Sequence, residues 1–164
     1  APRRGTVLPL GQGVMNRGLT GGGGAPIAAA GWSRGLFYLL QFTWGLPVNA
    51  VGLLAFLCCA HLRHETFCNS LVTYLPGDGG GLSLGVFLFI RAQSASERRR
   101  LRAHEYGHTV QCLFLGPLYW LVVVLPSVIW YHFFAGFRKK YHVSYDALYC
   151  ERWATAWGKK WSRF

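Results

Sequence analysis

Two long stretches without any Asp, Glu, Lys or Arg constrain this chain more than any other feature. One covers residues 35–62 (28 residues) and the other covers residues 106–137 (32 residues). A membrane-spanning helix needs about 20 predominantly apolar residues, whereas an apolar run of about 10–14 residues is typical of a buried core helix. The two stretches therefore predict a mainly α integral membrane protein, with the lipid bilayer as a partner.

The charge composition agrees with this prediction. Charged residues make up 14% of the 164 residues, and 17 Lys and Arg against 6 Asp and Glu give a formal net charge of +11. An ordinary soluble domain carries about 25% charged residues, so a soluble acidic enzyme, a disordered tail and a coiled coil are all disfavoured. A chain this basic and this apolar is more typical of a protein that faces anionic lipid, and no nucleic-acid partner is expected.

The chain divides into an N-terminal arm and one domain. Residues 1–35 form a Gly-rich arm, and residues 36–164 form a single membrane-embedded domain. Gln41, Thr43 and Asn49 are polar within the first apolar stretch, so they should face protein or a water-filled cavity. The expected elements are a helix over 36–60 kinked at Pro47, a small β-hairpin with arms at 71–75 and 82–90, and helices over 97–115, 118–134 and 145–158.

The pattern His-Glu-x-x-His at residues 104–108 carries the chemistry. On a helix, residues four apart lie on one face, so the imidazoles of His104 and His108 can bind one metal ion. Glu105 lies about 100° further round the helix, where its carboxylate can hold a metal-bound water without being a ligand. Two His ligands beside a carboxylate base are typical of zinc hydrolases, so Zn²⁺ is the predicted cofactor and Glu105 the catalytic base.

A third protein ligand must come from elsewhere, because a catalytic zinc site normally has three. The chain holds only four Glu and two Asp. Glu97 points away from the His pair, almost two turns earlier on the same helix. Glu151, inside the last helix, is the preferred third ligand, and Asp146 is the alternative.

These motifs resemble a known group of enzymes, the gluzincin metallopeptidases. Glu151-x-x-Ala154 is similar to the Glu-x-x-Ala-Asp signature of the membrane peptidase family that includes the CAAX prenyl proteases and the heat-shock HtpX-type proteases. Thr155 stands where that family has an Asp that supports the metal ligands. The string His104-Glu105-Tyr106-Gly107-His108-Thr109 also resembles small bacterial membrane proteins that carry this motif. The resemblance implies a zincin-like domain with peptidase activity.

The predicted topology follows from the shared metal ion. His104 and Glu151 must reach one ion, so the chain must turn back after the His-Glu-x-x-His helix, either at Gly116-Pro117 or near Pro126, and form a returning hairpin. Both basic clusters, residues 98–102 and 138–140, then lie on one side of the membrane. The positive-inside rule makes this side cytoplasmic. The predicted location is therefore the bacterial inner membrane, with the metal site near its cytoplasmic face.

Together these features predict a membrane-embedded zinc metallopeptidase that cleaves a peptide or membrane-protein substrate with a zinc-activated water. The segment over 82–90 precedes the metal helix and either binds extended substrate by β-augmentation or is purely structural. One of Tyr131, His132, Tyr141, His142 and Tyr145 is a candidate for stabilising an oxyanion. The alternative function is a non-catalytic membrane adaptor or chaperone with a structural zinc site, in which Cys112 would be the closing fourth ligand.

Overall fold

A four-stranded mixed sheet forms the centre of the computed structural model, which describes residues 33–162. The strand order is β1-β2-β4-β3, with β2 and β4 parallel and the two outer pairs antiparallel. The strands are β1 (Arg63–Phe67), β2 (Ser70–Tyr74), β3 (Gly80–Leu84) and β4 (Phe87–Arg91).

This sheet replaces the simple hairpin that was predicted from residues 71–75 and 82–90. The chain reverses at Gly85, whose positive φ of 67° suits glycine, so the second predicted arm divides into β3 and β4. Residues 87–90 are all buried, and an uninterrupted apolar run is typical of an interior strand. β4 therefore pairs with both β2 and β3, and Gly-rich β3 lies at the edge.

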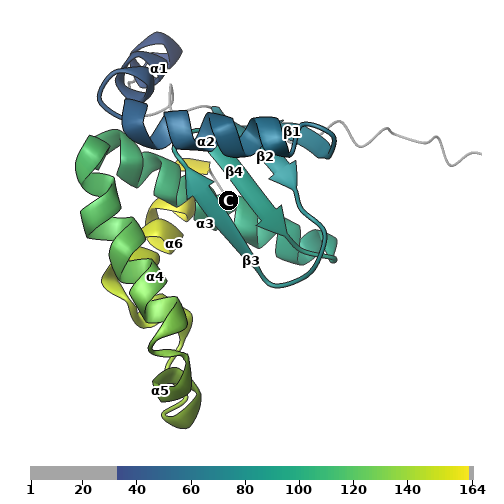
Figure 1. Ribbon diagram of the computed structural model, residues 1–164, viewed down its shortest axis with the longest axis vertical. Helices are drawn as coiled ribbons and strands as arrows, with labels where there is room; N and C mark the ends of the chain where they lie inside the picture. Colours follow the sequence, from purple (N-terminus) through teal and green to yellow (C-terminus); the bar gives the residue numbers. More distant parts are fainter. Residues whose placement is uncertain (1–32, 163–164) are drawn as a thin grey trace, which may run out of the picture.

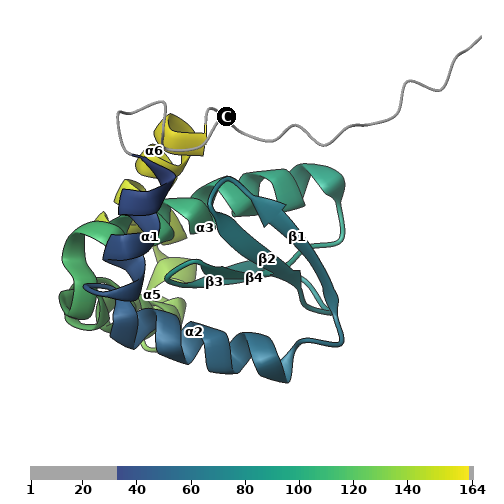
Figure 2. The same ribbon diagram turned by 90° about the horizontal axis from the view of Figure 1, so that it is seen from above.

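Helices cover both faces of the sheet. α2 lies on one face and α3 on the other, with α6 packed against α3, while α4 and α5 form an arm that projects away from the sheet (Figures 1 and 2). The α-helices are α1 (Arg34–Phe42), α2 (Leu46–Cys58), α3 (Ala95–Leu115), α4 (Leu125–His132), α5 (Ala135–Lys140) and α6 (Tyr149–Ser162). Short 3₁₀ or π-helical segments connect them: η2 (Gly116–Leu118), η3 (Trp120–Val124) and η4 (Tyr145–Ala147).

The two uncharged stretches each fold around a sharp corner instead of forming one long helix. α1 and α2 meet at 89°, and the α3–η2 segment meets the η3–α4 segment at 116°. The two parts of each bent pair, taken together, have the length and hydropathy of a membrane span. No single helix within residues 33–162 has them. This finding contradicts the predicted mainly α integral membrane fold and the predicted location in the bacterial inner membrane.

Buried polar side chains explain the first corner. Asn49 donates from Nδ2 to the backbone oxygen of Gln41 over 2.8 Å, and its Oδ1 accepts from the backbone N–H of Val86 over 2.9 Å. Gln41 donates to the carbonyl of Thr109 over 3.0 Å. Gln41 and Asn49 thus face protein as predicted, whereas Thr43 is exposed. These bonds join the corner to both the sheet and α3.

The predicted elements beyond the sheet differ mainly at their ends. The helix over 97–115 is confirmed by α3, which begins at Ala95 because the Ser94 side chain accepts from the N–H of Glu97. The predicted helix over 118–134 is divided among η2, η3 and α4, and the last helix begins at Tyr149. The predicted arm over 1–35 lies almost entirely outside the described residues.

Candidate metal centre

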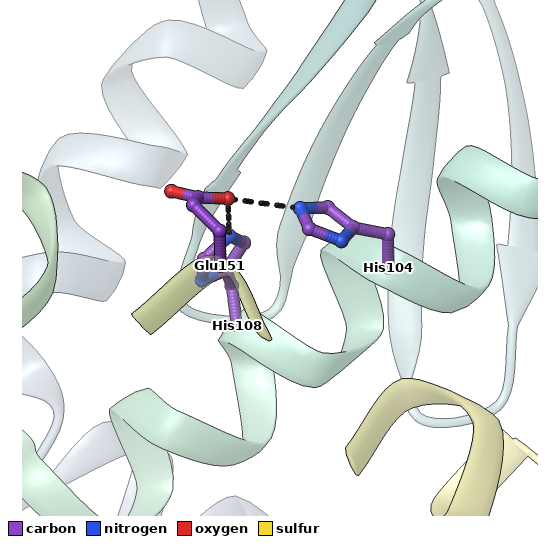
Figure 3. Close-up of side chains that lie close together, drawn as sticks. All are labelled: His104, His108 and Glu151. Atoms are coloured by element: carbon purple, nitrogen blue, oxygen red, sulfur yellow. Dashed lines mark hydrogen bonds and ion pairs between the residues drawn. The ribbon is translucent and has the colours of Figure 1, made fainter. Parts of the chain in front are cut away.

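Two imidazoles and one carboxylate meet between α3 and α6. Glu151 Oε2 lies 3.1 Å from Nε2 of His104 and 3.3 Å from Nε2 of His108 (Figure 3). One potential ligand atom from each residue lies within 4.8 Å of the others. Ligand atoms placed about 2.0–2.1 Å from a tetrahedral ion are separated by roughly 3.3 Å, close to these distances. The three residues could therefore hold a metal ion.

Close packing of α3 against α6 brings Glu151 to the two histidines. A methyl group at Gly107 would overlap the backbone carbonyl of Ala154, and one at Gly158 would overlap the carbonyl of Ala103. Glycine at these two positions lets the helix backbones touch. The carboxylate of Glu151 can then reach the face of α3 that presents His104 and His108.

In each imidazole, Nε2 faces Glu151, and the other ring nitrogen, Nδ1, has a hydrogen-bond partner of its own. His108 Nδ1 lies 2.7 Å from Oε1 of Gln111, and the amide nitrogen of Gln111 donates to the carbonyl of Cys150 over 2.8 Å. Since the Gln111 oxygen can only accept, His108 carries a proton on Nδ1. His104 Nδ1 lies 2.9 Å from the Thr155 hydroxyl, which can accept in the same way.

The chemistry of this donor set fits a cation. With its proton on Nδ1, a neutral His108 presents a lone pair from Nε2 toward Glu151 Oε2, which is also an acceptor. Two acceptors 3.3 Å apart repel each other unless a proton or a metal ion lies beside them. Hydrogen bonds to the far nitrogens of ligating histidines are the usual support of a metal site.

Two hydroxyls hold the other oxygen of the Glu151 carboxylate. Ser127 Oγ donates to Oε1 over 2.5 Å, and the Tyr145 hydroxyl donates to the same atom over 3.2 Å. Burial opposes ionisation of Glu151, but the adjacent imidazoles of His104 and His108 and the Ser127 hydroxyl outweigh it and hold the pKa of its carboxyl well below the usual range. Glu151 is therefore an ionised carboxylate with Oε2 directed at the histidines.

Glu105 lies beside this group on α3 without belonging to it. Its side chain is buried, and burial raises the pKa of its carboxyl to about 7. Gly81 of edge strand β3 lies directly against the carboxylate, because a methyl group at Gly81 would overlap Glu105. A carboxyl that gains or loses a proton near neutral pH is suited to general acid–base chemistry.

The site opens into a cavity of about 790 Å³. His104, Glu105, His108 and Glu151 all line it, together with residues of β3, η3, α4 and η4. Two walls differ in character: β3 and the residue before it contribute Gly79, Gly80 and Gly81, whereas the η3–α4 segment contributes Val123, Val124 and Val128. A ligand in the cavity therefore meets strand backbone on one side and apolar side chains on the other.

The two alternative ligands, Asp146 and Cys112, lie outside the three-residue group. Asp146 is exposed on η4 and lines the cavity, but it does not belong to the group. Cys112 is buried outside the group, and burial raises the pKa of its thiol to about 12, which disfavours a thiolate ligand. Tyr131, His132 and Tyr145 line the cavity.

Apart from the position of Thr155, sequence reasoning did not assign any residue a role in supporting His104, His108 or Glu151. Gln111, Ser127 and Tyr145 contact His108 or Glu151, yet no motif assigns them these roles. Gln111 could have been found, because it lies three residues after His108 on the same helix. The contacts of Ser127 and Tyr145 with Glu151 depend on tertiary packing.

Comparison of this chain with protein-family models, curated proteins and solved structures found no match.

Proposed function

We propose that this protein is a zinc-dependent hydrolase that cleaves peptide bonds. The observation that carries the proposal is the position of Glu105, a buried carboxyl beside the His104–His108–Glu151 group and on the wall of the same cavity. Three protein ligands leave one position of a tetrahedral ion open, which is typical of catalytic zinc sites. The nitrogen and carboxylate donors, without a thiolate among them, suit zinc.

In the proposed reaction, the bound metal ion and Glu105 have separate roles. A zinc ion bound there would supply a Lewis acid that polarises the scissile carbonyl and acidifies water. Glu105 accepts one proton from the attacking water as the carbon–oxygen bond forms. Glu105 then gives this proton to the amide nitrogen as the carbon–nitrogen bond breaks, so the products are a carboxylic acid and an amine.

The edge of strand β3, which is unpaired within the described residues, favours a peptide as the substrate. β3 is the outermost strand on the cavity side, and residues 79–83 line the cavity next to Glu105. Its outer backbone groups have no strand partner within residues 33–162. An extended peptide can pair with such an edge, which would hold a scissile bond beside Glu105.

The non-catalytic alternative requires a closed site. A structural zinc site has four protein ligands, and no fourth His, Cys, Asp or Glu joins the group within the described part of the chain. The open cavity beside the group also favours a catalytic role over a structural one.

Replacement of Glu105 by Gln tests the proposal. The purified wild-type chain should bind about one zinc ion and cleave peptides in a quenched fluorescent library. Glu105→Gln should keep the zinc but lose about 10²–10⁴-fold in kcat, because the attacking water has no proton acceptor. Mass spectrometry of the metal and peptide turnover are the two measurements.

Two further variants make the result interpretable. Glu97→Gln, a change of the same type in the first turn of α3, should keep both metal and turnover. His104→Ala should remove the metal. Equal turnover by the wild type and Glu105→Gln, or full zinc retention in His104→Ala, would contradict the proposal.

A further inference from the structure

Arg138 is a cavity residue that the reaction outlined above does not use. It lies in the last turn of α5 and lines the cavity that contains the metal-binding group. Its guanidinium carbon lies 5.2 Å from the ring centroid of Tyr145 and 5.8 Å from that of Trp130. Contact with two aromatic rings holds a guanidinium in place while leaving its charge intact.

The hydrogen-bonding capacity of this guanidinium is largely unused. Arg138 Nη2 donates to the carbonyl of Tyr131 over a long 3.4 Å, its Nε is buried without a partner, and its Nη1 forms no hydrogen bond with residues 33–162. No carboxylate of the described chain lies within ion-pair distance of it. Arg102, by contrast, is paired with Glu65. Arg138 is therefore positioned but not neutralised.

Tyr145 connects this cation to the metal-binding group. Its hydroxyl donates to Glu151 Oε1 over 3.2 Å, while its ring contacts the Arg138 guanidinium. The charge of Arg138 thus lies one tyrosine side chain away from a metal ligand. A substrate bound at the metal site would place its neighbouring groups within reach of Arg138.

The remaining charges of the cavity also favour an anion. Apart from Glu105 and Glu151, the charged lining residues are Arg100, Arg138 and Lys159 against the single carboxylate of Asp146. A surplus of one sign in a concave site raises the local concentration of the opposite charge.

We propose that Arg138 binds a carboxylate of the substrate, so that the enzyme prefers peptides with a free C-terminus or an acidic side chain close to the scissile bond. The planar fork of a guanidinium matches the two oxygens of a carboxylate. This inference rests on the proposed peptidase function, which it makes more specific.

Matched peptides test the preference in the zinc-loaded wild-type chain. One series carries a free C-terminal carboxylate or its amide, and a second series carries Glu or Gln at each position around the scissile bond. We expect kcat/KM to be ~10–100-fold higher for the carboxylate member of one pair, as for a hydrogen bond between charged groups. The series in which the preference occurs identifies the source of the carboxylate.

Variants assign the preference to Arg138. Arg138→Gln should lower the ratio between the paired peptides to about one, mainly through KM, while its zinc content stays at the wild-type level. Arg138→Lys keeps the charge without the fork and should retain part of the preference. Lys140→Gln removes a nearby charge that does not line the cavity and should leave the ratio unchanged.

The outcomes separate this inference from the proposed function. Equal cleavage of the paired peptides by the wild type, or an unchanged ratio in a folded Arg138→Gln, would overturn the role of Arg138 alone. Absence of turnover with every peptide would count against the peptidase. Calorimetry of zinc-loaded Glu105→Gln with the same paired peptides then decides whether the carboxylate preference exists in binding.

Discussion

At the residue scale, the identity of residue 155 matters because of a single hydrogen bond. The Thr155 hydroxyl lies 2.9 Å from Nδ1 of His104 and can accept a hydrogen bond from it, which leaves Nε2 available for a metal ion. Thr155 stands where the Glu-x-x-Ala-Asp signature has its Asp. A neutral oxygen can therefore orient this histidine here.

We expect Thr155→Val to lower zinc affinity by ~10–100-fold, because the isosteric side chain cannot accept the imidazole proton. Thr155→Asp should retain or increase the affinity, since a carboxylate is a stronger acceptor. Thr66→Val, at an exposed position of β1, is the matched control. Competition with a chelating dye measures all three, and wild-type affinity in Thr155→Val would show that the bond is unimportant.

Glu105 should make the stability of the metal-free protein depend on pH. Burial raises its folded-state pKa from 4.5 to about 7, so the folded state holds this proton more tightly than the unfolded chain does. Its contribution to stability is therefore fully present below pH 4.5 and is lost as the pH rises through 7. The ionised carboxylate costs stability above that range.

Glu105→Gln should consequently stabilise the protein in the presence of a chelator. The expected gain in the free energy of unfolding is roughly 2–3 kcal/mol at pH 8 and below about 1 kcal/mol at pH 5. Urea unfolding at the two pH values measures the gain, with Glu97→Gln as a control that should show none. A gain of equal size at both pH values would exclude titration of Glu105 as the cause.

At the scale of elements, the α3–α6 crossing brings His104, His108 and Glu151 together. Gly107 and Gly158 let the two backbones touch, and Glu151 projects from α6 toward the histidines of α3. A side chain at the crossing would separate the helices, because the overlapping atoms belong to the backbone of the opposite helix.

Gly107→Ala should therefore destabilise the fold by about 1–3 kcal/mol and weaken zinc binding. Gly136→Ala in α5 is a matched control, because nothing lies within 4 Å of the added methyl group. That change should leave zinc binding intact, and the helix propensity of Ala should keep or raise stability. Thermal unfolding and zinc titration measure both effects. A normal zinc site in Gly107→Ala would disprove the close-contact argument.

At the scale of the whole molecule, large apolar side chains remain exposed in unusual number. They gather on α1, α2 and the η3–α5 segment, and examples are Leu39, Leu54, Leu57, Leu121 and Phe133. Exposed apolar surface of this extent marks an interaction site. Because the net charge is +11, we expect this face to bind an anionic lipid surface, which requires no helix to cross the membrane.

We predict that the protein binds vesicles containing anionic lipid more tightly than neutral vesicles, and less tightly in high salt. Replacing Leu54 and Leu57, which are 64% and 58% exposed, by Gln should weaken this binding by ~10-fold or more. Thr66→Gln should not. Flotation with vesicles measures the binding. Absence of flotation, together with a dimer in solution, would assign the apolar face to a second copy of the chain.

Features that depend on the local spacing of residues could be predicted from the amino-acid sequence. The helix over 97–115 was predictable because helical periodicity involves residues three or four apart. The same spacing placed His104 and His108 on one face and Glu105 beside them. Glu151 was selected by chemistry, because few carboxylates exist in the chain and the pattern after it resembles a known signature.

The elements that cover the apolar stretches, and the residues that support the candidate metal site, became clear from the three-dimensional fold. An uncharged run indicates only that a segment is hydrophobic, and either a bilayer or a packed sheet can cover such a segment. The corners at 89° and 116° were therefore not predictable from it. The strand order and the contacts of Ser127 and Tyr145 with Glu151 depend on residues far apart in the chain. Their partners are set by packing, for which a single sequence contains no local signal.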